Sequence, residues 1–402
     1  MKKRLKRAYQ LILKNYAVRY LKRNKPYIIA VTGSVGKTST KDAIYQVLSA
    51  RYKVNKNQGN YNNEFGVPLS ILGLNVGKYP FGWAKNILLG FLKSLIAKNH
   101  FDKIVLEMGA DHPGDIKYLT SFIKSDIAVV TRVASSHLEF FGSLENVAKE
   151  KGMLVEALDS NGWAVLNYDD VSVKAMTNRM NKTNKNVIFY GLDKNADIFA
   201  SGITMDQRGI DFTVHYKKES KKAHLNIIGK HLIYSVLAGI ACGLVCDINL
   251  EKCIQAAENF QMEKGRLNMI KGINDSMIIN DTYNANPESV RAAIQTLDDL
   301  AGKKRRIVVL GDMLELGSES DEFHREIGKM LVDKVDLLFA VGEKSKFIFE
   351  EAKKKMGDKV FWFPDSSSAI NTVKESIKSG DILLVKGSRG MKMEKIVEAI
   401  KI

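Results

Sequence analysis

The sequence predicts an α/β protein with a mainly parallel central sheet and a second α/β domain after it. Three observations support this prediction. Short apolar runs rich in β-branched residues alternate with segments of helical spacing. The first of these runs leads through a glycine-rich loop directly into a helical segment. The chain has 402 residues, which is long enough for two or three domains. Alternating strands and helices favour a parallel sheet that is covered on both faces.

The order of the predicted strands gives the domain organisation. The runs "KPYIIAVTG", "FDKIVLEMGA", "SDIAVVTRV" and "NGWAVLN" have the composition of buried strands. Shorter alternating strands such as "DFTVHY" follow, and after "LAGKKRR" a new series begins with "RIVVLGDM", "LLFAVG", "VFWFP" and "DILLVKGS". We therefore predict a basic helix over residues 1–27, a central domain over 28–301 and a Rossmann-like domain over 302–402.

The positive charge of the chain is concentrated at its N-terminus. The formal net charge is +16, and residues 1–25 contain ten Lys or Arg and no acidic residue. The rest of the chain therefore carries only +6, without the interleaving of basic and aromatic residues that nucleic-acid sites show. We expect no nucleic-acid partner.

Two segments carry an apolar stripe at helical spacing. In residues 1–25 the stripe is Leu5, Tyr9, Ile12, Leu13, Tyr16 and Tyr20, and in residues 79–99 it is Trp83, Ile87, Phe91 and Leu95. A basic helix with such a stripe can lie on an anionic membrane surface or dock on its own domain. For residues 1–25 the sequence favours neither alternative, whereas internal packing is the commoner meaning of a stripe like that of residues 79–99.

The remaining composition indicates a reduced compartment. The three cysteines, Cys242, Cys246 and Cys253, lie in one apolar helical stretch without CxxC spacing, so we expect buried thiols. No apolar run is long enough to span a bilayer, and no secretory signal is recognisable. We expect a cytoplasmic monomer, with peripheral contact at the inner face of the membrane through residues 1–25 and 79–99 as an additional hypothesis.

The loop "VTGSVGKTSTK", residues 31–41, has the composition of a phosphate-binding site. A strand that passes through glycines into a helix directs backbone N–H groups and the positive end of the helix dipole to one point. Lys37 would neutralise phosphate charge, and the hydroxyl of Thr38 would bind Mg²⁺. Val31 stands where the common GxxxxGK[ST] pattern has its first glycine, so the central domain is predicted to be of a variant P-loop type.

Eight further motifs follow in order and give the chain a family resemblance. They are "NQGNYNNEFGVPLSILGL", "EMGADHPGDI", "SSHLEFFGS", "VAKEKGMLVEAL", "EKGRLN", "NDTYNANPESVRAAI" and "VLGDMLELG", and "LVKGSRGMKME" closes the series. Together with the loop they resemble the Mur ligase family over about residues 28–402. The resemblance implies an ATP-dependent ligase that forms an acyl phosphate, and the expected reaction adds D-alanyl-D-alanine to a muramoyl-peptide precursor of peptidoglycan.

The resemblance also implies roles for individual residues. The nucleotide-binding positions are Gly33, Ser34, Val35, Gly36, Lys37, Thr38, Ser39, Arg266, Asp281 and Asn284. Arg266 would reach the γ-phosphate and Asp281 the ribose hydroxyls. The matched catalytic positions are Lys37, Asn63, His137 and Lys151.

Two Mg²⁺ ions are implied by the same comparison. Thr38 and Glu107 would serve one ion, and His137 would serve the second. Lys151 matches a lysine that the family carbamylates with CO₂, which converts an ammonium into a carboxylate-like ligand, and Lys149 is the competing candidate. Lys386, Ser388 and Arg389 are the expected contacts of the incoming amine substrate.

The chain departs from the family pattern in three places. Only the basic segment precedes the loop, where the family usually has a UDP-binding domain, and residues 79–99 are additional. Ser235 replaces an asparagine that contacts adenine in the family. Other acceptors therefore stay open, namely a lipid-linked precursor, a folate or a glutamate polymer, and so do a P-loop ATPase that is not a ligase and a non-catalytic ATP-binding relative.

Overall fold

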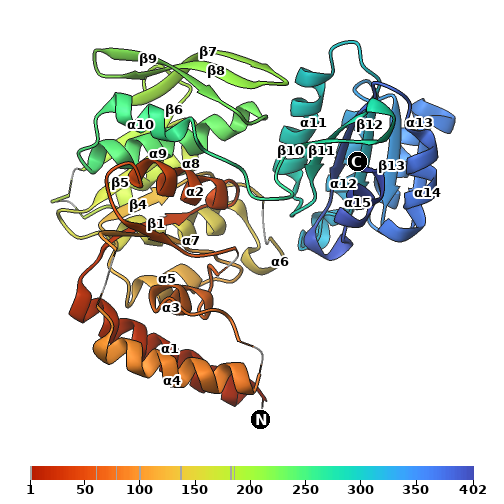
Figure 1. The fold of residues 1–402 in the computed structure, drawn as a ribbon. Helices are drawn as coiled ribbons and strands as arrows, with labels where there is room; N and C mark the ends of the chain where they lie inside the picture. Colours follow the sequence, from red (N-terminus) through yellow and green to blue (C-terminus); the bar gives the residue numbers. More distant parts are fainter. Residues whose placement is uncertain are drawn as a thin grey trace.

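The computed structural model describes residues 2–59, 61–77, 79–98, 101–135, 138–181, 183–184 and 186–402, and within them the chain forms two α/β bodies (Figure 1). The first body is built on a nine-stranded sheet with the order β2-β3-β1-β4-β5-β6-β7-β8-β9. The second has a six-stranded sheet with the order β10-β11-β15-β12-β13-β14. The predicted α/β class with two sheet-bearing domains is confirmed.

The first sheet is parallel from β2 to β7 and antiparallel from β7 to β9. Its strands are β1 (Tyr27–Thr32), β2 (Val54–Lys56), β3 (Lys103–Glu107), β4 (Ile127–Val130), β5 (Trp163–Asn167), β6 (Val187–Gly191), β7 (Ile198–Asp206), β8 (Gly209–Tyr216) and β9 (Glu219–Leu225). Successive residues of β1 enter two different cores. Ile29 and Val31 pack on one face and Ile28 and Ala30 on the other, as expected for a strand buried on both sides.

Helices cover both faces of this sheet. On one side lie α2 (Lys37–Leu48), α9 (Ile233–Val245) and α10 (Leu250–Ala257); on the other lie α3 (Gly66–Ile71), α5 (Asp115–Thr120) and α7 (Leu144–Glu156), with α6 (Leu138–Phe141) and α8 (Val171–Lys174) nearby. Cys242, Cys246 and Cys253 are buried free thiols, as predicted.

Two long helices form an additional layer beneath α3 and α5. They are α1 (Lys2–Asn24) and α4 (Phe81–Ile96), which lie side by side at the bottom of Figure 1. The ring of Tyr9 stacks on Trp83 with 4.3 Å between centroids, and the Asn86 amide donates to the Tyr9 hydroxyl at 3.1 Å. Leu13 and Tyr20 are also buried. The stripe of α1 therefore docks on its own domain, which decides between the two alternatives for that stripe.

The predicted stripe of α4 is divided between two environments. Trp83 and Ile87 are half-buried and pack against the core below the sheet, whereas Phe91 and Leu95 are 42% and 43% exposed. Among the described residues, no helix combines the length and apolar composition needed to cross a bilayer.

The second body begins earlier in the chain than predicted. Its strands are β10 (Asn268–Lys271), β11 (Met277–Asp281), β12 (Arg306–Gly311), β13 (Leu337–Val341), β14 (Val360–Phe363) and β15 (Ile382–Lys386). Because β11 pairs in parallel with β15, residues before 302 belong to this sheet, and the predicted boundary at 301/302 is wrong. The helices are α11 (Pro287–Ala301), α12 (Ser320–Leu331), α13 (Lys346–Met356), α14 (Ser366–Ser376) and α15 (Glu394–Ile400).

The docking of α1 can be tested by truncating a buried side chain. Leu13→Ala should lower the free energy of unfolding by about 2–4 kcal/mol, because Leu13 is fully buried and its removal leaves a cavity. Leu11→Ala, two residues away and 49% exposed, should change it by only about 0.5 kcal/mol. Thermal unfolding and the rate of tryptic cleavage within α1 would measure both effects, and equal behaviour of the two variants would contradict the docking.

Candidate functional site

The loop between β1 and α2 needs glycine at two positions. A Cβ atom on Gly33, whose φ is +147°, would lie 2.0 Å from Oγ1 of Thr131. Gly36, with φ of +83°, adopts the left-handed conformation at the start of α2. The Ser34 N–H donates to the Arg132 carbonyl at 2.7 Å, and the Thr131 hydroxyl donates to the Val35 carbonyl at 2.6 Å. The segment after β4 therefore fixes the loop, and α2 points its N-terminus at it.

Lys37 and Thr38 begin α2, at the place where an anion would bind. The ammonium of Lys37 lies over its own loop and donates to the carbonyls of Gly33 and Ser34 at 2.9 and 3.3 Å. Its pKa is lowered, chiefly because burial removes the charge from water. Thr38 is buried, and its hydroxyl accepts a hydrogen bond from the Arg266 guanidinium at 3.1 Å. Predicted residues from the two bodies thus meet at this point.

Glu107 ends β3, directly beside the end of β1. Val31 and Glu107 are register partners in the sheet, so the carboxylate emerges next to the loop. One oxygen, Oε1, accepts a hydrogen bond from the Asn62 amide at 2.9 Å. The other, Oε2, is buried without a hydrogen-bond partner and lies 3.8 Å from Nζ of Lys41. A buried carboxylate oxygen with unused lone pairs is a suitable ligand for a divalent cation.

Lys41 completes this cluster, although it was not among the predicted site residues. Its side chain is fully buried, and Nζ has no hydrogen-bond partner although it lies 3.7 Å from Asp42 and 3.8 Å from Glu107. Lys41 follows Lys37 by four residues, which places both on one face of α2. That spacing within "GKTSTK" was the available signal, but a lysine at this position also suits an exposed helix face.

Lys151 lies in α7 and is 1% exposed. Its Nζ donates to the Ala110 carbonyl at 3.4 Å, in the segment that follows Glu107. Burial, reinforced by the positive charge of Lys37, lowers the pKa of Lys151 to about 7. The competing candidate, Lys149, is exposed.

The carboxylate before Lys151 fixes the position of α7. Glu150 accepts hydrogen bonds from the backbone N–H groups of Gly114 and Ile116, at 2.9 and 2.7 Å. These bonds hold α7 against the first turn of α5. Lys151 is therefore presented to the loop side of the sheet from a rigid helix.

Of the predicted catalytic residues, Asn63 has a local structural contact. The side chain of Asn63 accepts hydrogen bonds from the N–H groups of Phe65 and Gly66 at 3.2 and 2.9 Å and so fixes the start of α3. Its neighbour Asn62 is the one that contacts Glu107. A catalytic role of Asn63 stays a prediction. His137 lies outside the described residues.

Residues of the second body surround Tyr283. The guanidinium carbons of Arg266 and Arg389 lie 4.1 and 5.9 Å from its ring centroid, and Arg389 is exposed. Asn284, a predicted nucleotide contact, is also exposed. These side chains form a cationic and aromatic surface on the second body near Thr38.

The predicted substrate residues Lys386 and Ser388 are engaged within the protein. Lys386 is 2% exposed and bonds to Asp281 at 2.5 Å and to the Asn284 carbonyl at 2.9 Å. The Ser388 hydroxyl accepts from the Leu314 N–H at 2.9 Å and lies 3.3 Å from the Ala285 carbonyl. Asp281 is therefore already paired with a cation, across the β11–β15 register.

A loop for phosphates, a buried carboxylate and three lysines beside it define a nucleotide-dependent enzyme of the P-loop type. Comparison with known protein families shows which family of such enzymes the chain belongs to. Residues 31–243 match the Mur ligase middle domain, and residues 265–389 match the Mur ligase glutamate ligase domain. The chain belongs to the Mur ligase family and is an ATP-dependent, ADP-forming ligase. This excludes the alternative of a P-loop ATPase that is not a ligase.

Individual relatives agree with this assignment. The chain is 33% identical to the UDP-N-acetylmuramoyl-tripeptide–D-alanyl-D-alanine ligase of Bacillus subtilis, over 96% of this chain and 78% of that protein. It is 31% identical to the enzyme of the same name from Escherichia coli, over 93% and 76%. The crystal structure of the MurF ligase of Thermotoga maritima in complex with ADP matches with a TM-score of 0.81 and 26% identity, covering 96% of this chain and 82% of that one.

The assignment of Glu107 can be tested by removing its charge. Glu107→Gln should reduce the gain in ADP affinity that Mg²⁺ provides by on the order of 10–100-fold, because a carboxylate ligand is replaced by an amide. Calorimetric titration of ADP with and without Mg²⁺ measures this. Glu156→Gln, which changes a surface partner of Arg179, is the control. The same Mg²⁺ dependence in both variants would exclude Glu107 as a ligand.

Proposed function

We propose that the chain joins D-alanyl-D-alanine to the terminal carboxylate of a muramoyl-tripeptide precursor in peptidoglycan synthesis. The site supports the reaction class, because Lys37, Thr38, Glu107 and Lys151 surround one phosphate-binding loop. The choice of substrates is supported by the names of the relatives above, which match more than nine-tenths of this chain. Folate and glutamate-polymer acceptors lack support of this kind.

The proposed reaction has two steps. The acceptor carboxylate attacks the γ-phosphorus of ATP, forming an acyl phosphate and breaking the bond to ADP. The amine of the dipeptide then attacks the acyl carbon, loses a proton and expels phosphate. Lys37 and Arg266 would hold the γ-phosphate and stabilise the charge on its oxygens during transfer. The N-terminus of α2 would bind the remaining phosphates.

The residues present fit a magnesium ion. The test is Oε2 of Glu107, which is buried without a hydrogen-bond partner and lies 3.8 Å from Nζ of Lys41, in a residue paired in register with Val31 at the start of the loop. Thr38 and Glu107 would hold this ion, and a bound Mg²⁺ would neutralise charge on the triphosphate. His137 stays the proposed ligand of a second ion.

We infer that Lys151 is carbamylated. In this reaction the neutral Nζ attacks the carbon of CO₂ and loses a proton, which gives an N-linked carboxylate. The burial of Lys151 supports the inference, because its amine faces a carbonyl and has no carboxylate partner at hydrogen-bonding distance among the described residues. The pKa of about 7 leaves much of the amine neutral at physiological pH.

The substrate contacts differ in their support. Arg389 is exposed near Tyr283 and suits a bidentate contact with the carboxylate of the dipeptide. Lys386 and Ser388 would need to exchange their present partners to bind substrate. We further propose that the protein is a monomer and that it contacts a membrane surface through α1 and α4.

The proposed ligation has a direct test. Incubation of the protein with ATP, Mg²⁺, UDP-muramoyl-tripeptide and D-alanyl-D-alanine should produce the pentapeptide with release of one phosphate per peptide bond. Mass spectrometry would detect the increase in acceptor mass. Binding of ADP without any acceptor mass increase would contradict the proposed acceptor while leaving the family assignment intact.

Lys151 can be tested by chemical rescue. Lys151→Ala should reduce the ligation rate by about 100-fold or more, because a ligand charge in a buried site is lost. Acetate or a similar short carboxylate should restore part of the rate by occupying the vacated space. Lys149→Ala is the matched control, since it removes an exposed lysine from the same helix. Full activity of Lys151→Ala without added acid would exclude the carbamate.

A further inference from the structure

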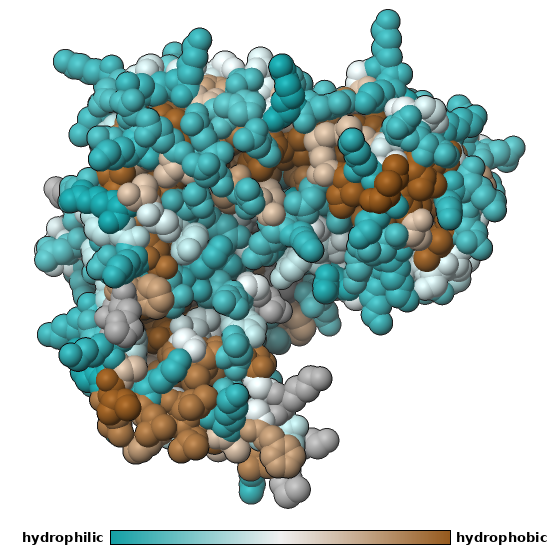
Figure 2. All heavy atoms as spheres, viewed as in Figure 1, coloured by the Kyte–Doolittle hydropathy of each residue, from teal (hydrophilic) through white to brown (hydrophobic). Residues whose placement is uncertain are grey.

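The outward side of α4 is mainly apolar. Its most exposed large apolar residues are Phe81, Leu88 and Ile96, at 85%, 61% and 74% exposure. Phe91, Leu92 and Leu95 are each 42–43% exposed. The spacing of these residues puts them along one side of the helix. Figure 2 shows this side as the apolar area over α1 and α4 at the lower end of the molecule.

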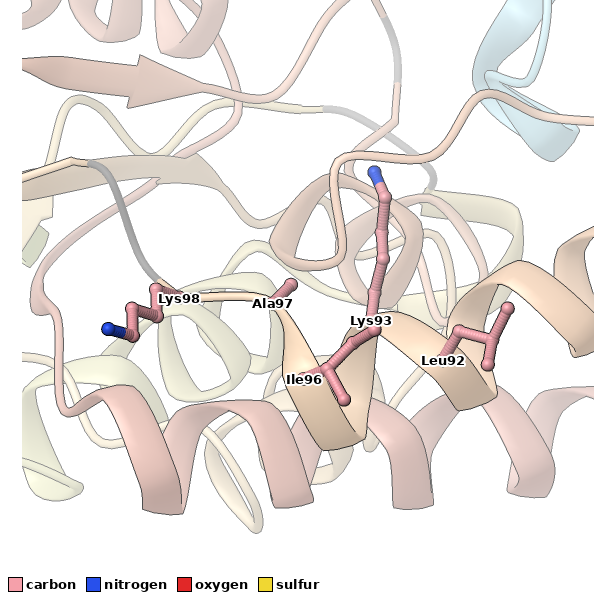
Figure 3. A pocket seen from close by; sticks show the side chains of 5 residues that line it. All are labelled: Leu92, Lys93, Ile96, Ala97 and Lys98. Carbon is pink, nitrogen blue, oxygen red and sulfur yellow. The ribbon is translucent and has the colours of Figure 1, made fainter.

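One lysine at the flank of this surface, Lys93, is turned toward the domain. Nζ of Lys93 donates to the Gly73 carbonyl at 2.7 Å, on the body of the domain. In Figure 3 Lys93 points to one side of α4 while Ile96 points to the opposite side, and Leu92, Ile96, Ala97 and Lys98 line an open hollow with it. Lys93 therefore does not interrupt the apolar side chains of α4, whereas the exposed Lys85, four residues after Phe81, adds a positive charge to this side of the helix.

The outward side of α1 supplies positive charge beside this surface. Arg7, Arg19 and Lys22 are exposed on α1. Lys14, by contrast, faces inward to Ser121 and to the ring of Tyr118. The sequence has no acidic residue in residues 1–41 or 65–101, which include both helices. Basic side chains thus border an apolar surface without a negative charge from either helix.

The pair of helices is held as a fixed platform. Tyr9 and Trp83 stack between them, and Gly90 of α4 lets Tyr16 approach so closely that a Cβ would lie 3.0 Å from its ring. The apolar stripe of α1 is buried in this contact and is not available to another partner. The large apolar side chains on the outward side of α4, by contrast, remain exposed in the folded domain.

We propose that the α1–α4 surface docks on an anionic lipid bilayer. Its apolar residues would enter the headgroup region while the basic residues of α1 contact acidic lipid headgroups, which is the combination typical of interfacial helices. Charge complementarity favours this occupant over an uncharged protein surface. The length and composition of the helices fit contact along the surface, since no described helix could span the bilayer.

Sedimentation with vesicles tests the proposal on the full chain. Vesicles of phosphatidylcholine with about 30% phosphatidylglycerol should bind the protein at least about tenfold more strongly than vesicles of pure phosphatidylcholine, and this binding should fall as the salt concentration rises. Leu88→Ser/Ile96→Ser and Arg7→Gln/Arg19→Gln/Lys22→Gln should each reduce this binding by about tenfold or more. ADP binding of all variants should be unchanged, which shows that they are folded.

Matched controls change similar residues elsewhere. Val171→Ser/Leu314→Ser removes two exposed apolar side chains, and Lys353→Gln/Lys354→Gln/Lys355→Gln removes three exposed lysines. Both should bind anionic vesicles like the unchanged protein. Equal binding to both lipids, or equal losses in controls and test variants, would overturn the proposal. A third result would also overturn it: the unchanged protein binds no vesicles and is a dimer by light scattering, and Leu88→Ser/Ile96→Ser converts that dimer to monomers.

Discussion

The close approach of Gly33 to Thr131 is the constraint on which the site depends. Only a residue without a side chain fits there, because a Cβ would overlap the Thr131 hydroxyl. The contact ties the end of β1 to the segment after β4, and β1 lies between β3 and β4 in the sheet. Glu107 at the end of β3 and Lys37 at the start of α2 therefore emerge at the same edge. A parallel sheet places its site at this edge because all carboxyl ends of its strands meet there.

Buried charge is the second organising feature. Lys41 and Lys151 are buried and Lys37 is half-buried beside the loop, and the carboxylates nearest to Lys41 are Asp42 and Glu107, at 3.7 and 3.8 Å. Burial away from water is the main cause of the lowered pKa of both Lys37 and Lys151. A bound polyphosphate would add negative charge beside Lys37 and so favour its charged form. The removal of lysine ammonium groups from water therefore accounts for both the anion preference of the loop and the reactivity proposed for Lys151.

Local patterns predicted the parts of the structure that depend on neighbouring residues. The strands of both sheets that carry long apolar runs and the loop before α2 were all recognisable. The boundary at 302 was wrong because β11 joins its sheet through β15, about a hundred residues later, and no local pattern records that pairing. The same limit applies to side chains. "NN" at 62–63 does not tell which amide reaches Glu107, and the pairing of Lys386 with Asp281 follows from strand register alone.

The helix pair α1 and α4 shows why a periodic stripe leaves its partner undecided. Both helices repeat apolar residues at helical spacing, and this period is the same for protein and lipid partners. Only the packing in the folded structure shows which stripe is buried against the protein and which stays exposed. Tyr9 and Leu13 are buried against the domain, whereas Leu88 and Ile96 stay exposed because the other side of α4 packs on α1 and on residues 72–74 after α3. An apolar face that remains exposed after the cores are filled, next to a basic one, is evidence for a partner outside the fold.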